Sequence, residues 1–418
     1  MAAKSALKNS FGSWFKNPTD GYLNELLGPG GAEALRKLDV EIERARSTLY
    51  TAGTAPQRNF SENVLMMIKQ STLQKRYENP VYAGPEIPYY NADVFQKAAR
   101  LSRFANASYT VPAINIMCDL VPSLAPEHIH LVYSGKGVGC PHFFIATDPL
   151  TDQLVLAIRG TADATDALTD TLAEKSPFLG GNAHLGMFEC ATSVIEHGRD
   201  KLVELMTGTG KKLSVTGHSL GAGTAVLVML MLCGESGYSA PFSAGRNTTC
   251  WAFAAPPVFG PPEKIPRWTS SNIFAFVHHV DMIPRLGLAA VFSLCQAEKI
   301  VDEMDISASE RASFLFNYDT SFRVQLPDHG SYGIMADVES DFTKFTSVGT
   351  NILMFNDQDG KITCYTVEPY QLNNRILLHQ NMVTCHLLGG YIKIIDECVN
   401  DLEPPPGLVR RIIHSVVG

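Results

Sequence analysis

A chain of 418 residues is long enough for one large domain or two ordinary ones, and 45% hydrophobic residues can fill a sizeable core. The formal net charge of −8 leaves no basic surplus, so the composition argues against a nucleic-acid-binding protein and against strong attraction to anionic lipid. The nine cysteines occur singly, without a CxxC pair, and predict reduced thiols in a cytoplasmic protein rather than a zinc site.

The first 110 residues are predicted to form a helical N-terminal region. Leu35, Leu38, Ile42 and Leu49 recur at helical spacing, and residues 91–109 follow a similar pattern. Proline and glycine separate these segments. We therefore expect a helical flank over residues 1–110 and a second unit over residues 111–418.

From Ile129 onward the pattern changes to short apolar runs that alternate with helical segments. The runs predicted as strands are 128–134, 142–148, 153–160, 211–217, 248–257, 272–281 and 348–355, and the predicted helices between them are 182–206 and 219–232. Such alternation predicts an α/β fold with a mainly parallel central sheet. Residues 285–345 are less regular, include a predicted helix at 297–316, and are expected to form an insertion. The apolar stretches are shorter than the roughly 20 residues that span a bilayer, so no transmembrane helix is expected.

The stretch Gly217-His218-Ser219-Leu220-Gly221 lies where a predicted strand meets a predicted helix. In a G-x-S-x-G turn the chain reverses so sharply that the positions two residues either side of the serine have no room for a Cβ atom. The turn is expected to lift the serine Oγ clear of the sheet into an exposed position. Ser219 is therefore the candidate nucleophile, and the alternative is an accidental loop sequence.

Several ordered motifs between residues 156 and 286 resemble the class 3 lipases, and within them the diacylglycerol-lipase-like branch. They are "LAIRGTADATDALTD", "AHLGMF", "VTGHSLGAGTA", "WAFAAPP" and "DMIPRL". A weaker similarity extends over about residues 100–400. The resemblance implies an α/β-hydrolase fold and a serine esterase that acts on lipids.

A serine nucleophile needs a histidine base and an acid that orients the histidine. Asp281 follows a predicted strand, where the chain order of α/β-hydrolases and the resemblance both put the acid; a turn or cap aspartate is the alternative. His329 and His386 compete as the base. We favour His386, because it follows a later strand and the resemblance places the base at the start of the last helix. His278 and His279 lie inside an apolar strand beside Asp281, and they are expected to pack in the core or to support the site from behind rather than to act as the base.

Two donors are expected to form the oxyanion hole. One is the backbone N–H of Leu220, the residue after the nucleophile, and the resemblance implies the backbone N–H of Thr161 as the other. Asp163, Asp166 and Asp170 form an acidic series, but their spacing lacks the features of a calcium loop. We therefore expect no metal and no cofactor.

The sequence predicts a serine hydrolase that cleaves a mono- or diacylglycerol or a related acyl lipid through an acyl-enzyme intermediate. We expect the protein to meet this substrate in the cytoplasm, at the surface of a membrane or a lipid droplet. No nucleic-acid partner is expected, and the sequence identifies no protein partner. Two alternatives stay open: a catalytically silent lipase-like scaffold, and a soluble carboxylesterase or acyltransferase.

Overall fold

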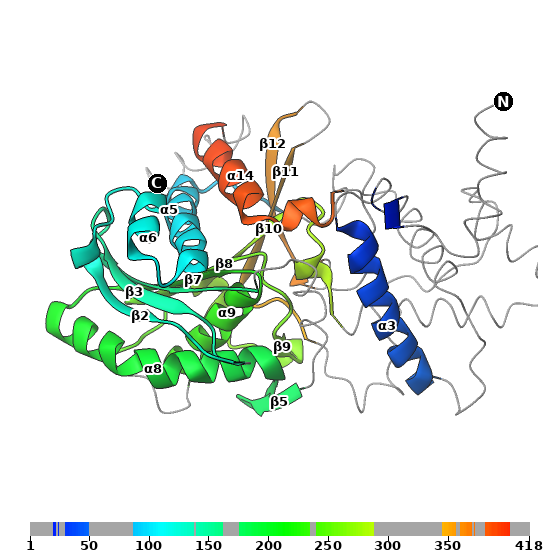
Figure 1. Ribbon diagram of the computed structural model, residues 1–418, viewed down its shortest axis with the longest axis horizontal. Helices are drawn as coiled ribbons and strands as arrows, with labels where there is room; N and C mark the ends of the chain where they lie inside the picture. Colours follow the sequence, from blue (N-terminus) through cyan, green and yellow to red (C-terminus); the bar gives the residue numbers. More distant parts are fainter. Residues whose placement is uncertain are drawn as a thin grey trace, which may run out of the picture.

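A mixed sheet of nine strands runs through the centre of the part of the chain that the computed structural model describes (Figure 1). The described residues are 20–21, 24, 30–49, 87–137, 139–161, 175–234, 240–287, 345–356, 360–369, 372 and 381–401. The predicted helix at 297–316, His329 and most of the predicted insertion lie outside these residues.

The strand order in the sheet is β1-β12-β11-β10-β8-β7-β4-β3-β2. The five strands from β11 to β4 are parallel to one another, and the strands at both edges pair antiparallel. Their bounds are β1 Ile87–Pro88, β2 Ile129–Tyr133, β3 Phe143–Asp148, β4 Gln153–Ile158, β7 Leu213–His218, β8 Thr248–Phe253, β10 Ile273–His278, β11 Thr350–Asn356 and β12 Ile362–Val367. The predicted α/β-hydrolase architecture with a mainly parallel centre is confirmed.

Helices cover the two faces of the sheet (Figure 1). Helices α5 (Ala92–Ala107), α6 (Ile114–Leu120) and α14 (Leu388–Asp401) lie on one face, and α8 (Leu185–Thr209) and α9 (Leu220–Cys233) lie on the other. Alternate residues of a strand point to opposite faces. In β4, Leu154, Leu156 and Ile158 therefore pack toward α8 and α9, whereas Val155 and Ala157 pack toward α5.

Helix α9 is apolar around its whole circumference, and Gly221 through Leu232 are all buried. A helix of this kind belongs in the interior of a protein, and α9 packs between the sheet and α8. It spans 14 residues. Within the described residues, none of the helices combines the length and the apolar character that crossing a bilayer requires.

The seven predicted strands correspond to β2, β3, β4, β7, β8, β10 and β11, and the two long helices are confirmed; β1, β5, β6, β9 and β12 were not predicted, and one helix boundary is shifted. Residues 181–184 form β6 (Gly181–His184), which pairs with β5 (Lys175–Phe178) and β9 (Phe259–Gly260), so α8 starts at Leu185 and not at Asn182. Strand β12 was not predicted from the sequence. Its side chains include three half-buried positions, whereas the central strands β4, β7 and β11 are buried along almost their whole length.

The N-terminal segments are helical where the structure describes them. Helix α3 (Gly31–Leu49) buries Leu35, Leu38 and Ile42, as the spacing predicts. Helix α5 packs on α14 and on β7, so it covers the same sheet that holds the predicted hydrolase strands. The domain boundary at residue 110 stays a prediction.

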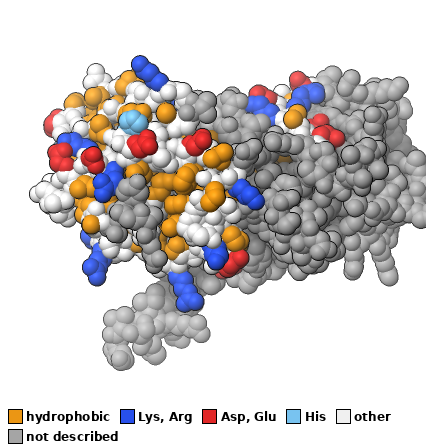
Figure 2. Space-filling model, turned by 90° about the horizontal axis from the view of Figure 1, so that it is seen from below, with side chains coloured by type: hydrophobic (Ala, Val, Ile, Leu, Met, Phe, Trp, Pro, Cys, Tyr) orange, Lys and Arg blue, Asp and Glu red, His pale blue; other side chains and the backbone are white. Residues whose placement is uncertain are grey.

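Figure 2 shows the molecule from below, the side on which α8 lies in Figure 1. Hydrophobic side chains gather in the centre of this face, and Lys and Arg side chains lie mainly toward its margins.

Candidate active site

Ser219 lies in the tight turn between β7 and α9, in a backbone conformation that only strong local constraints hold, with φ +58° and ψ −130°. A Cβ atom on Gly217 would lie 2.3 Å from the carbonyl oxygen of Gly221, and one on Gly221 would lie 2.4 Å from the carbonyl oxygen of Ile158. Both glycines are therefore required by contacts with backbone atoms, which cannot move aside cheaply. This is the steric relation that the G-x-S-x-G pattern predicts.

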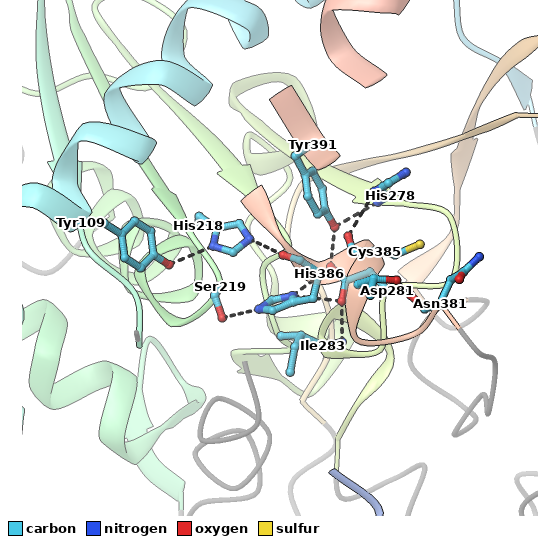
Figure 3. A network of polar contacts seen from close by, with 11 residues as sticks. Tyr109, His218, Ser219, His278, Asp281, Ile283, Asn381, Cys385, His386 and Tyr391 are labelled. Carbon is cyan, nitrogen blue, oxygen red and sulfur yellow. Dashed lines mark hydrogen bonds and ion pairs between the residues drawn. The ribbon is translucent and has the colours of Figure 1, made fainter. Parts of the chain in front are cut away.

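Three side chains from distant parts of the chain meet at this turn (Figure 3). His386 Nε2 lies 2.8 Å from Ser219 Oγ, and His386 Nδ1 lies 3.0 and 3.1 Å from the two carboxylate oxygens of Asp281. A carboxylate can only accept here, so Nδ1 carries the imidazole proton and Nε2 accepts the proton of the Ser219 hydroxyl. The arrangement is that of a serine whose proton can pass to a histidine oriented by an acid.

The carboxylate of Asp281 is fully buried, three residues beyond the end of β10. It accepts hydrogen bonds from His386, from the hydroxyl of Tyr391 at 2.6 Å and from the backbone N–H of Ile283 at 3.0 Å. Burial by itself would raise the pKa of this carboxyl, but His386 and the hydrogen bonds lower it below its usual range. Asp281 therefore stays ionised and can stabilise a positive charge on the imidazole.

His218, inside the turn, supports the backbone that carries His386. Its Nε2–H donates to the carbonyl oxygen of His386 at 2.8 Å, and its Nδ1 accepts from the hydroxyl of Tyr109 at 2.9 Å. Burial lowers the pKa of His218 to about 3, so the ring is neutral at physiological pH. Both ring nitrogens are occupied, which suits His218 to a structural contact beneath the turn.

Of the two predicted oxyanion donors, Leu220 directly follows Ser219, and Thr161 follows a glycine that contacts the turn. Leu220 is the first residue of α9, so its backbone N–H is at the positive end of the helix. A Cβ atom on Gly160 would lie 2.3 Å from the carbonyl oxygen of His218, so the chain at the end of β4 passes directly against the turn. Thr161 is the residue that follows Gly160 in the chain.

The surroundings of Ser219 differ from the sequence expectation in one respect. Ser219 is only 1% exposed and His386 only 2%, whereas the turn was expected to be exposed. The turn does lift the serine away from the sheet, but neighbouring residues cover it.

His278 and His279 do not contact Ser219. His278 Nδ1 lies 3.1 Å from the carbonyl oxygen of Cys385, and the backbone N–H of His278 donates to the Tyr391 hydroxyl. Cys385 is buried, which raises the pKa of its thiol to about 11, and its sulfur lies 3.9 Å from His279 Nδ1. The contacts of His278 and His279 with Cys385 thus fix the position of the segment that precedes α14.

Sequence reasoning missed the roles of Tyr109 and Tyr391. The one sequence signal for Tyr391 is its position five residues after His386, and nothing in the local sequence of Tyr109 marks it. Asp163, Asp166 and Asp170 lie outside the described residues. Among the residues that the structure describes, no group of three or more His, Cys, Asp and Glu side chains could hold a metal ion.

The fold and the geometry around Ser219 define an α/β-hydrolase with a serine, histidine and aspartate in hydrogen-bonded series. Residues 155–290 match the family model of the class 3 lipases. All five ordered motifs that suggested this family lie within this match.

Curated relatives show the same similarity over part of the chain. The diacylglycerol lipase-alpha of Homo sapiens is 32% identical over 165 residues, which cover 35% of this chain and 14% of the relative. The diacylglycerol lipase-beta of Mus musculus is 28% identical over 173 residues, 39% of this chain and 24% of the relative. The matches thus span a quarter or less of the length of these relatives.

Solved structures with a similar chain path include two fungal lipases. The Rhizomucor miehei lipase propeptide complex aligns with a TM-score of 0.49 and 16% identity, over 74% of this chain and 82% of that chain. The lipase from Rhizopus microsporus var. chinensis aligns with a TM-score of 0.49 and 15% identity, over 73% and 89%.

Proposed function

We propose that this protein is a serine hydrolase that cleaves carboxylic esters of lipids through an acyl-enzyme intermediate. The observation that carries the proposal is the hydrogen-bonded series from Ser219 through His386 to Asp281 at the turn between β7 and α9. The match of residues 155–290 to the class 3 lipase family supports a lipid ester as the substrate class.

In the proposed reaction, Ser219 Oγ attacks the ester carbonyl while its proton passes to His386 Nε2. Asp281, ionised and fixed by three donors, orients the imidazole and stabilises its positive charge. The backbone N–H groups of Leu220 and Thr161 would donate to the oxyanion. His386 then protonates the leaving alcohol, and after a water molecule enters, the same imidazole activates it to release the acid.

The finer substrate assignment is a mono- or diacylglycerol, or a related acyl lipid. The relatives named diacylglycerol lipase support it, although the similarity covers only 35% of this chain in the first of them. We propose that the enzyme meets this substrate in the cytoplasm, at the surface of a membrane or a lipid droplet.

Replacing the nucleophile tests the proposal directly. Ser219→Ala should leave a folded protein that is no longer labelled by a fluorophosphonate probe and no longer hydrolyses p-nitrophenyl esters. Ser193→Ala is the matched control, because Ser193 is a buried serine on α8 whose hydroxyl has no partner among the described residues. Absence of labelling in the unmodified protein would favour a silent scaffold, and unchanged hydrolysis by Ser219→Ala would overturn the assignment. Activity on short chains without any gain from micelles would favour a carboxylesterase.

The base is tested by two histidine variants. His386→Ala should lower both acylation and turnover by about 10⁴-fold, since one imidazole serves both steps. His329→Ala should change turnover little, because on this proposal His329 takes no part in proton transfer. Measuring probe labelling and steady-state ester hydrolysis for both variants distinguishes them, and the reverse pattern would make His329 the base.

A further inference from the structure

A second cavity lies at the opposite end of the parallel strands from Ser219. We name it the amino-end pocket: a cavity of about 310 Å³ with Lys97, Arg100, Lys212 and Arg246 at its rim and Trp251 and Phe274 in its wall. Its size falls in the range of small-molecule sites. Leu213, the first residue of β7, also lines it.

The pocket is separate from the candidate active site. Strand β7 starts at the pocket and ends at the turn that holds Ser219, with six residues between these ends. At about 3.3 Å per residue, the two sites lie roughly 20 Å apart. A ligand in the amino-end pocket therefore cannot be the ester that Ser219 attacks.

Positive charge collects at the pocket although the whole chain carries a net charge of −8. Arg100 is neutralised by the buried carboxylate of Asp148, which it contacts at 2.6 Å. Lys97, Lys212 and Arg246 form no ion pair with any described carboxylate. Three cations without internal counterions thus surround one small cavity, which favours an anionic occupant.

The turn that carries Arg246 is held in place by side chains. Asn247 accepts a hydrogen bond from the backbone N–H of Ser243 at 2.8 Å and donates to the carbonyl oxygen of Pro241 at 2.8 Å. Gly245 has φ +77°, and a Cβ atom on it would lie 3.2 Å from the side-chain oxygen of Asn272. The turn therefore presents Arg246 at the rim from a constrained backbone.

Two aromatic side chains also line the pocket. The rings of Trp251 and Phe274 stack with centroids 4.7 Å apart, and the indole N–H of Trp251 donates to the hydroxyl of Thr249 at 3.0 Å. With that N–H already paired, Trp251 offers the pocket apolar surface. The pocket can thus hold an anionic group at its rim and an apolar part against its wall.

We propose that the amino-end pocket binds a phosphorylated group that carries at least two negative charges, such as a phosphate monoester. Lysine and arginine side chains bind phosphate oxygens by charge-assisted hydrogen bonds, and three of them match a multiply charged group better than a single carboxylate. The group can belong to a soluble metabolite or to a lipid headgroup, since both present the same oxygens. The proposal does not depend on the hydrolase activity.

Calorimetric titration of the full chain with pyrophosphate tests the pocket. The triple variant Lys97→Gln, Lys212→Gln, Arg246→Gln should weaken pyrophosphate binding by about tenfold or more, and added salt should weaken binding to the unmodified protein. Lys201→Gln is the matched control, because Lys201 is a lysine on α8 that pairs with Glu204 outside the pocket. Ser219→Ala should bind pyrophosphate like the unmodified protein, so failure of the pocket and failure of the proposed function remain distinguishable.

Flotation with vesicles separates the two sources of phosphate. Phosphatidylcholine vesicles with and without phosphatidic acid are compared for the unmodified protein and the triple variant. Binding that requires phosphatidic acid and is lost in the triple variant assigns the pocket to a lipid headgroup, whereas pyrophosphate binding without vesicle binding assigns it to a soluble molecule. The proposal is wrong if neither probe binds at millimolar concentration, or if the triple variant binds both as well as the unmodified protein does.

Discussion

Asp281 shows how a single residue can keep a charge in the interior. Burying an ionised carboxylate costs several kcal/mol unless it is paired and hydrogen-bonded. At Asp281 the compensation comes from His386, Tyr391 and the backbone of Ile283. The Tyr391 contact is the shortest of these, and the same hydroxyl accepts the backbone N–H of His278 at 3.0 Å.

Tyr391→Phe should therefore act through the position of Asp281. Removing the hydroxyl leaves one carboxylate oxygen and one backbone N–H without this partner, so we expect turnover to fall about tenfold with little change in KM, and the free energy of unfolding to fall by about 1–3 kcal/mol. Ester hydrolysis kinetics and denaturant unfolding measure both effects. Tyr133→Phe, which removes an exposed contact with His197, is the control. If Tyr391→Phe loses stability but keeps full turnover, the tyrosine serves packing alone.

At the scale of elements, the turn between β7 and α9 depends on how closely β4 approaches α9. A Cβ atom on Gly221 would lie 2.4 Å from the carbonyl oxygen of Ile158 and 2.7 Å from the backbone nitrogen of Gly160. Both contacts are with backbone atoms of the neighbouring strand and its end. The strand and the helix must therefore separate if this glycine is replaced.

Gly221→Ala should displace the turn that holds Ser219. We expect a loss of about 1–3 kcal/mol in the free energy of unfolding, because overpacking against fixed backbone is relieved only by movement, together with loss of probe labelling. Gly208→Ala is the matched control: Gly208 lies in α8 with open space around it, so alanine should stabilise the protein by up to about 1 kcal/mol. Equal stability of both variants would show that β4 and α9 can separate at no cost.

At the scale of the whole molecule, His218 connects three segments that are distant in sequence. Tyr109 follows α5, His218 ends β7, and His386 precedes α14, and two hydrogen bonds to the His218 ring join them. Burial lowers the pKa of His218 to about 3, whereas an unfolded chain has a histidine pKa near 6.5. The folded state therefore excludes a proton that the unfolded state binds.

This difference predicts how stability depends on pH. The contribution of His218 is fully present above about pH 6.5 and is lost as the pH falls toward 3, at up to about 1.4 kcal/mol per pH unit. Asp281, whose pKa is also lowered, adds to the loss only below about pH 4. Denaturant unfolding of the unmodified protein and of His218→Asn between pH 7 and 4.5 should show a shallower pH slope for the variant. Identical slopes would mean that His218 is protonated in the folded state as well.

Local sequence patterns predicted the central strands and the turn that carries Ser219. Continuous apolar runs such as residues 154–158 predicted the central strands, because parallel strands are buried on both faces. The glycines at 217 and 221 predicted the strained turn at Ser219; the requirement at Gly217 lies within the five residues of the motif, whereas the one at Gly221 comes from the end of β4. Strand β12 and the short strand β6 were not predicted: β12 lacks a continuous buried apolar run, and β6 lies at the start of the segment that was predicted as a helix.

Contacts between distant residues were decided only by the tertiary structure. From the sequence, His386 was favoured over His329 by its place after a later strand and by the family resemblance, but the spacing from Asp281 alone could not exclude His329. The packing of α14 against α5 and the sheet brings His386 to Ser219 and Asp281 and places Tyr391 against the same carboxylate. The amino-end pocket likewise gathers residues from α5 and from the starts of several strands. Such sites depend on which buried surfaces fit together, and that fit is a property of the whole core and not of any one segment.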